Sequence, residues 1–374
     1  MASNAAVLDA PPQPPANGGK APRVTTSCPA NIRETKIAFG YIPQADLATA
    51  NTAAEIWSLT KTNPAMAVVT PVTETDANDI GKGDEFPTQV FPTSMDTSVA
   101  LEKYASSEAL AWAFCFATGK ATKTGAAGTG FVYDAVPSDP VVNCINLPPF
   151  SYYEQIRAEP DSVVDRGLIG MVINDFVLTM ESGPGRANCR LVVNCVGTGK
   201  IATPSAVVLP AVTPEHFLNA ASATINIAGI DYVLSKSFIS LEFRWNNNVR
   251  LPSGFYPGSG TQNNYAVRGR MEYNTREIAL TFVARAAKGS PEFNALINQT
   301  ESPLTITLTG AVIGAGPTTH AMSITAPRTQ LSAVTNADAD GIVTVNCTAM
   351  FLKPPTGDII TMSATCLQDK ILNL

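Results

Sequence analysis

Strand-like segments follow one another along almost the whole chain, and this pattern leaves few fold classes open. The segments are rich in Val, Ile, Thr and aromatic residues and are bounded by Gly, Pro and Asp, as β-strands are. In 239–245 and 268–273 apolar and polar residues alternate, which is typical of strands with one face in water. We therefore predict a mainly β fold of β-sandwich or barrel-forming sheets. The predicted strands are 36–42, 65–74, 88–104, 171–181, 189–197, 224–234, 237–245, 265–274, 277–287, 304–312 and 342–352.

Two segments break the strand pattern and predict short helices. The first begins with Ser106 as a candidate N-cap and has Glu108 in its first turn, where the helix dipole favours an anion. Gly119 is a C-terminal stop signal. Because residues 109–117 are apolar on every side, we expect this helix to be buried between sheets or subunits.

The second helical segment has the same kind of start. Ser290 is the candidate cap, a proline follows at the first helical position, and Glu292 lies in the first turn. Phe293, Leu296 and Ile297 then mark one apolar face at helical spacing.

The two predicted helices occupy matching places in the chain, which indicates an internal duplication. An offset of 184 residues aligns Ser106 with Ser290 and Glu108 with Glu292, and each helix follows a strand, a polar loop and two further strands. We predict tandem duplicated β domains with one short helix per repeat. The predicted parts are an Ala/Pro-rich flexible arm at 1–32, a first domain at 33–200, an Ala/Pro-rich linker at 201–223 and a second domain at 224–374.

The charge content favours a protein whose surface is hidden in an assembly. Charged residues make up 15% of the 374-residue chain, against about 25% in typical domains. A monomer with few surface charges is the alternative that composition leaves open. The net charge of −6 argues against a protein that reads duplex DNA, because phosphate binding needs a basic footprint. No window holds the roughly 20 apolar residues of a membrane helix, so we expect no membrane partner.

Reactive groups that could form a catalytic or metal centre are sparse. The seven cysteines form no C-x-x-C pair, and we expect reduced thiols that are mostly buried. The two histidines, His216 in the predicted linker and His320 in a predicted loop, have no serine-nucleophile motif beside them. We interpret both as ordinary exposed or core histidines. No catalytic residue, metal site or cofactor is therefore predicted.

A polar segment at 246–265 separates two predicted strands and is longer than most loops within a domain. It contains no acid and no histidine, so we interpret it as an assembly loop rather than an active-site lid. Arg250 carries its only charge, and Phe255, Tyr256 and Tyr265 are the predicted inter-subunit anchors, because aromatic side chains dominate interface energetics.

Four segments together resemble one protein family: the opening strand at 33–46, the loop, strand pair and helix at 79–119, their repetition at 235–299 and the late strands at 324–352. In this order they resemble the tail tube (major tail) proteins of non-contractile tailed bacteriophages, and in particular the class with two tube domains fused in one chain. The long arm and the additional segment at 148–166 depart from that pattern.

The resemblance implies a structural virion protein that is not an enzyme. In that family each β-sandwich domain joins its neighbours' sheets into an inner barrel, so homotrimer rings with pseudo-sixfold symmetry would stack into a tube for DNA ejection. The implied partners are the chain itself, the tape measure, tail terminator and distal tail proteins, and double-stranded DNA in transient, non-specific passage. The implied location is the virion tail after synthesis in the host bacterial cytoplasm.

Two other functions are open at this stage. One is a β-sandwich binding module of a virion, either a capsid decoration or a receptor-binding protein. The other is an enzyme such as a glycan hydrolase that uses Asp/Glu pairs, for which carboxylates in an aromatic-rich cleft would be expected.

Overall fold

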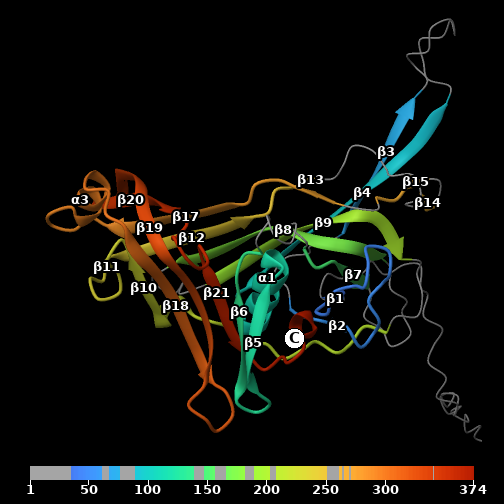
Figure 1. Ribbon diagram of the computed structural model, residues 1–374, viewed down its shortest axis with the longest axis horizontal. Coiled ribbons are helices and arrows are strands. Elements are labelled where there is room, and N and C mark those ends of the chain that lie inside the picture. Colours follow the sequence, from blue (N-terminus) through green and yellow to red (C-terminus); the bar gives the residue numbers. More distant parts are fainter. Residues whose placement is uncertain are drawn as a thin grey trace, which may run out of the picture.

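The computed structural model describes residues 35–60, 67–75, 89–138, 147–155, 166–181, 189–202, 208–250, 261–262, 265–268, 271–339 and 341–374. The predicted arm at 1–32 lies outside these residues. The prediction of a mainly β fold is confirmed (Figure 1).

The first half of the chain contains strands and one helix in an order close to the prediction. The β5–β6 hairpin and β7 were not predicted from the sequence: each of these strands has only 6 residues, and β5 and β6 carry Gly. The elements are β1 (Lys36–Gly40), β2 (Ile56–Trp57), β3 (Val68–Thr75), β4 (Val90–Tyr104), α1 (Ser107–Thr118), β5 (Ala121–Ala126), β6 (Gly130–Ala135), β7 (Phe150–Gln155), β8 (Arg166–Glu181) and β9 (Cys189–Ala202).

The second half contains the longest strand, β19, and a C-terminal strand, β21, that was not predicted. The elements are β10 (Ala223–Ile227), β11 (Ile230–Asp231), β12 (Phe238–Asn246), β13 (Val249–Arg250), β14 (Thr261–Gln262), β15 (Tyr265–Ala266), β16 (Glu272–Tyr273), β17 (Glu277–Arg285), α3 (Pro291–Ile297), β18 (Ser302–Val312), β19 (Thr319–Ala339), β20 (Ile342–Phe351) and β21 (Thr361–Cys366), with 3-10 turns at Ala220–Ser222 and Ile371–Asn373.

Strand pairing follows the same order in the two halves. In the first half, β3 pairs with β4, β4 with β9, and β9 with β8. In the second half, β12 pairs with β17, β17 with β20, and β20 with β19. The antiparallel pair of β8 and β12 joins the two sets of four strands into one sheet.

A second layer of strands is also built in the same way in each half. β2 pairs with β1, β1 with β7, and β7 with the beginning of β8. β11 pairs with β10, β10 with β18, and β18 with the first part of β19. The β5–β6 hairpin and β21 have no counterpart: β21 pairs with both β6 and β19.

Helix α1 lies between the two layers of the first half, and all of its residues are buried, as predicted (Figure 1). Trp112 packs on Phe39 of β1 and Phe150 of β7, at centroid distances of 4.4 and 5.3 Å. Phe114 packs on Phe176 of β8, on the opposite layer, at 5.6 Å. An all-round apolar helix therefore fills the space that two sheets enclose.

The two halves share one hydrophobic core, which includes Trp112 from α1, Trp245 from β12 and Ile324 from β19. The predicted linker is only partly a connection, because β9 extends to Ala202 and β10 begins at Ala223. Between them, the described residues 208–222 run past the start of α1. The duplication and the domain boundaries stay predictions.

One local prediction in the second half is wrong. The expected strand at 265–274 is divided into β15 and β16, with a buried arginine, Arg268, between them. On the apolar face predicted for α3, Leu296 packs against the core, while Phe293 and Ile297 are 50% and 62% exposed.

Candidate functional site

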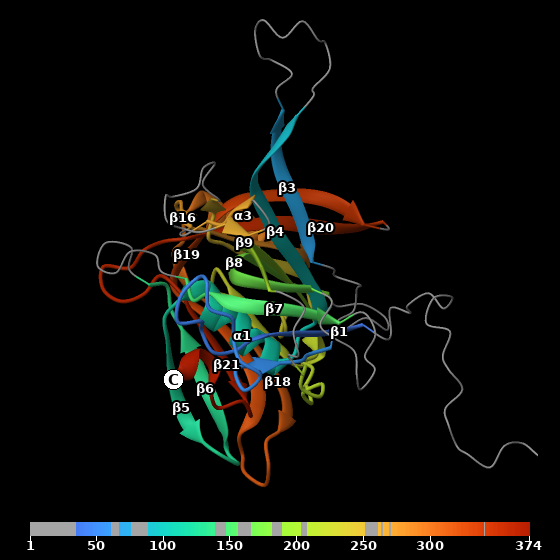
Figure 2. The same ribbon diagram turned by 90° about the vertical axis from the view of Figure 1, so that its right-hand side faces the viewer.

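At one end of the molecule the sheet ends in a hairpin made of β3 and the first part of β4, which projects from the body (Figures 1 and 2). Its apolar side chains are in water: Val72 and Phe91 are 37% and 46% exposed, and Val90 is 61% exposed. Within the described residues β3 pairs only with β4, so its other edge is open. A two-stranded ribbon is marginally stable in isolation, and an open edge is a template for pairing with another strand. Pro71 in β3 fits an edge position.

At the opposite end, the part of β19 that follows Thr329 is a second open edge (Figure 1). In the part of the chain that the structure describes, this part of β19 pairs with β20 on one side only. Beside it lies a hollow formed by α3, β19 and β20, with Phe293, Val334, Asn336 and Val343 among its lining residues. At each end of the sheet, half-buried or exposed apolar side chains thus lie next to a strand edge that pairs with no other strand within the described residues.

The sheet also has an open face with a shallow hollow across β8, β12, β17, β19 and β20. Along β12 and β17 its lining includes exposed residues such as Glu242 and Thr281 and also the buried residues Leu241 and Phe282. Glu181 and Glu242 are the charged residues of this lining, and the other residues are mostly hydroxyl-bearing, amide or small apolar ones. This face is polar and negatively charged at the hollow.

The predicted assembly loop lies largely outside the described residues, and so do Phe255 and Tyr256. Arg250 lies in β13, opposite Glu272 of β16, and it is exposed. Tyr265 lies in β15, which pairs in parallel with β4 at Ser94.

No local pattern in the sequence indicates the residue that holds the end of this loop on β4. Arg268 is 5% exposed, and its guanidinium donates to the carbonyl of Met95 at 2.6 Å and lies 2.5 Å from Asp96. A loop of the second half is thus held on a strand of the first half.

The predicted caps of α1 are confirmed, and one predicted cap of α3 is wrong. The Ser106 hydroxyl accepts the N–H of Ala109 at 3.2 Å, and Glu108 lies in the first turn. Glu292 likewise lies in the first turn of α3. Ser290 makes no side-chain cap, because its backbone is left-handed with φ of 44°, whereas an N-cap needs extended backbone to direct its oxygen at the first N–H groups.

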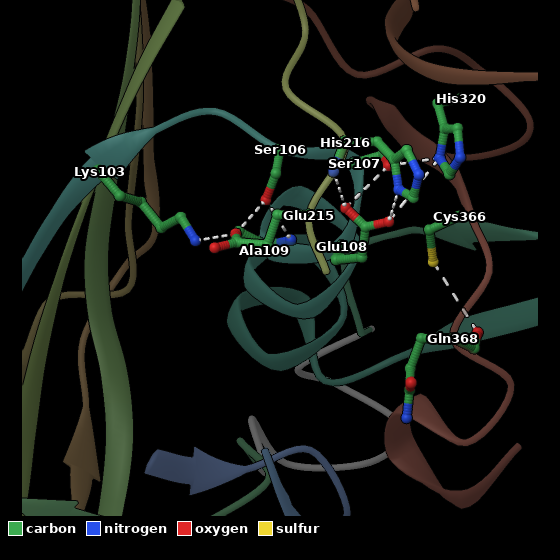
Figure 3. Close-up of polar contacts among 10 residues, drawn as sticks. All are labelled: Lys103, Ser106, Ser107, Glu108, Ala109, Glu215, His216, His320, Cys366 and Gln368. Atoms are coloured by element: carbon green, nitrogen blue, oxygen red, sulfur yellow. Dashed lines mark hydrogen bonds and ion pairs between the residues drawn. The ribbon is translucent and has the colours of Figure 1, made fainter. Parts of the chain in front are cut away.

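A polar cluster surrounds the start of α1 (Figure 3). Lys103 forms an ion pair with Glu215, and the Glu215 carboxylate also accepts the Ser106 hydroxyl at 2.7 Å. Burial lowers the pKa of Lys103, and the Glu215 charge opposes that shift. This pair fastens β4 to the segment that connects the two halves.

The two histidines, which the sequence placed apart in a linker and a loop, lie face to face beside Glu108 (Figure 3). Their ring centroids are 3.7 Å apart with planes inclined by 12°. His216 Nδ1 lies 2.8 Å from Glu108 Oε1, and His320 Nδ1 lies 2.8 Å from the Ser107 hydroxyl. His320 is the second residue of β19 and is 1% exposed, so the loop expected around it is wrong. Burial and then the neighbouring His216 lower the pKa of His320.

The cysteines that the structure describes, Cys115, Cys189, Cys195, Cys347 and Cys366, are free and buried. Burial raises their pKa values, that of Cys189 to about 12, so these thiols are unreactive core residues.

No family model matches the chain, and no curated protein matches it. None of the described helices is both long and apolar enough to span a membrane.

Proposed function

We propose that this chain is a structural subunit that assembles through its open sheet edges into rings, and that the rings stack into the tail tube of a non-contractile tailed bacteriophage. The observation that carries the proposal is the repeated strand order with open edges at its two ends. The role is mechanical rather than catalytic. The tape measure, tail terminator and distal tail proteins are the proposed heterologous partners, and the virion tail is the proposed location after synthesis in the bacterial cytoplasm.

The pairing of β8 with β12 is a template for contact between subunits. It joins the last strand of the first set of four to the first strand of the second set through seven residue pairs, from Ser240 with Glu181 to Asn246 with Asp175. By the same order, β19 of one copy would pair with β3 of the next. The contact uses two different surfaces, so it is head-to-tail, and such contacts generate closed rings when the rotation closes.

The open face of the sheet supports the proposed passage of DNA. If the sheets of neighbouring copies continue one another, this face becomes one wall of the ring, and we assign it to the lumen. Glu181 and Glu242 lie in its hollow, whose lining contains no basic side chain to bind phosphates. Arg244 and Arg285 stand on the same side of β12 and β17, outside the hollow.

Electron microscopy of the purified full chain tests the proposal. We expect rings or tubes in negative stain, after seeding if nucleation is slow, and a mass above that of the monomer in light scattering. A chain that stays monomeric in solution and in particles would contradict the tube function. A monomer that instead captures a glycan or a capsid protein would favour the virion binding module.

Deleting residues 252–262 is expected to leave the subunit folded and to prevent tube growth. The deletion leaves both ends of the loop attached, through Val249, which donates to Asn174 at 2.8 Å, and through Arg268 on β4. Melting temperature and negative stain on the same sample measure the two effects. Tubes of normal length from the shortened chain would show that this loop is dispensable.

Replacing Glu181 and Glu242 by lysine is expected to make assembled tubes retain duplex DNA. Each replacement raises the net charge by two, so the two together change it from −6 to −2. Retention should weaken steeply with salt, because log affinity falls by about 0.9 per phosphate contact for each unit of log salt concentration. The control is the pair Asp358→Lys and Asp369→Lys, which makes the same charge change at exposed positions away from the hollow. Equal retention by both variants would refute the assignment of this face to the lumen.

A further inference from the structure

Three metal-ligating side chains from distant parts of the sequence meet at the start of α1 (Figure 3). Glu108 comes from the first turn of the helix, His216 from the segment between the two halves and His320 from the first residues of β19. Their potential ligand atoms all lie within 4.8 Å of one another. The chain has only two histidines, and the fold brings both to the same carboxylate.

The distances suit one small ion between these atoms. A tetrahedral ion with bonds of about 2.0–2.1 Å separates its ligand atoms by about 3.4 Å. Glu108 Oε1 lies 2.8 Å from His216 Nδ1 and 3.8 Å from His320 Nδ1, so the two separations lie on either side of that value. An ion would replace the direct contact between Glu108 and His216. Because the two imidazole planes are nearly parallel, one ring would also have to turn out of the stack to direct its nitrogen at the same ion.

The surroundings already hold the carboxylate in place. Glu108 Oε2 accepts the backbone N–H of His216 at 3.0 Å and lies 3.1 Å from the Ser107 hydroxyl. Hydrogen bonds of this kind orient metal ligands. Ser107 also contacts His320 Nδ1, and it would turn to donate to Glu108 alone when that nitrogen binds an ion.

The donor set and the local charges select the class of ion. Two imidazole nitrogens and one carboxylate suit Zn²⁺ and similar transition metals, whereas Ca²⁺ and Mg²⁺ prefer oxygen ligands. The nearby charges of Lys103 and Glu215 compensate each other, which leaves the Glu108 carboxylate to balance the ion.

We propose that Glu108, His216 and His320 form a binding site for one divalent transition-metal ion of the Zn²⁺ type. The bound ion would join α1, the segment between the halves and β19 at one point. It is a structural clamp, and it does not depend on whether the chain forms tubes.

Metal titration of the full chain after chelator treatment tests the site. We expect one Zn²⁺ per chain by calorimetry, and a melting temperature that rises by about 5 °C when free Zn²⁺ is 100 times the dissociation constant. Co²⁺ should give the visible absorption of a tetrahedral nitrogen and oxygen site. His216→Asn is the main variant, because His216 is partly exposed and its loss leaves the core intact. It should weaken binding at least tenfold, and His320→Asn should do the same if it folds.

Glu301→Gln is the matched control, since it removes an exposed carboxylate that pairs with Arg328 far from the cluster, and its metal binding should equal that of the unmodified chain. Three results would overturn the proposal: no stoichiometric binding by the unmodified chain, unchanged binding by His216→Asn, or a thiolate-to-cobalt charge-transfer band, which would place the ion on cysteines.

Discussion

A proline on the outward side of β19 is expected to prevent assembly while the subunit stays folded. In an antiparallel strand the N–H groups of successive residues point to opposite sides. Of Thr335 and Asn336, which pair in register with Asn346 and Val345, one therefore faces β20 and the other faces the open edge. Thr335→Pro and Asn336→Pro therefore each remove one backbone N–H, in one variant on the side that faces β20 and in the other on the open side.

We expect one variant to lose stability and the other to lose assembly. The inward proline removes a hydrogen bond to β20 and should lower the melting temperature. The outward proline removes only a group that the next subunit would use, so the monomer should melt close to the unmodified chain. Each lost hydrogen bond is worth about 1 kcal/mol, and proline's bulk adds a steric cost. Because about 1.4 kcal/mol is a factor of ten, the concentration needed for assembly should rise at least tenfold.

Sedimentation or light scattering across a concentration series measures the assembly, and thermal unfolding of the same samples measures the subunit. If both variants form rings at the same concentration as the unmodified chain, β19 is not the contact edge. If both lose assembly only in proportion to lost stability, the proposed contact is also refuted.

Local signals predicted α1 well because everything that defines it is near in sequence. Ser106 caps it, Gly119 ends it in a left-handed conformation, and the apolar residues between them require a buried place. The same reasoning failed at Ser290, where the preceding turn sets a left-handed backbone that no composition rule anticipates.

The arrangement of the sheet could be predicted only in part. Alternating residues indicate that a segment such as β12 is a strand with one wet face, but they do not indicate its neighbours. β12 pairs with β17 on one side and with β8, from the other half of the chain, on the other side. Which strands pair with β12 depends on the whole sheet, so the pairing between the two halves could not be predicted from the sequence.

The histidine cluster is a site that local sequence patterns could not predict either. Glu108 was predicted as a helix-dipole residue, and His216 and His320 carry no local motif. Their meeting follows from the path of the segment between the halves past α1 and from the position where β19 begins. Only the tertiary fold contains that information.

Asn247→Ala is expected to be among the most destabilising single substitutions in this chain. Three asparagines in a row, 246–248, gave a loop signal in the sequence, yet the middle one is completely buried. Its side-chain amide donates to the carbonyls of Ala117 at 2.9 Å and Ile173 at 3.0 Å, and its oxygen accepts the indole N–H of Trp245 at 3.0 Å.

Alanine at this position removes these three hydrogen bonds from the core and adds a cavity. A buried polar group that loses its partner costs about 1–3 kcal/mol, so we expect a loss of roughly 3 kcal/mol or more and a melting temperature lower by about 5–10 °C. Asn246→Ala is the matched control, because the Asn246 side chain is half-buried and bonds only to Asn248 within the described contacts. It should cost less than about 1 kcal/mol.

The substitution also bears on assembly, since Asn247 connects the end of α1 to β8 at the point where the 246–265 loop begins. Loss of this connection should release the loop's first residues and raise the concentration needed for ring formation even at temperatures where the chain is folded. Denaturant unfolding and light scattering at 10 °C below the variant's melting point separate the two effects. Equal losses of stability in Asn247→Ala and Asn246→Ala would mean that the buried amide does not hold this junction.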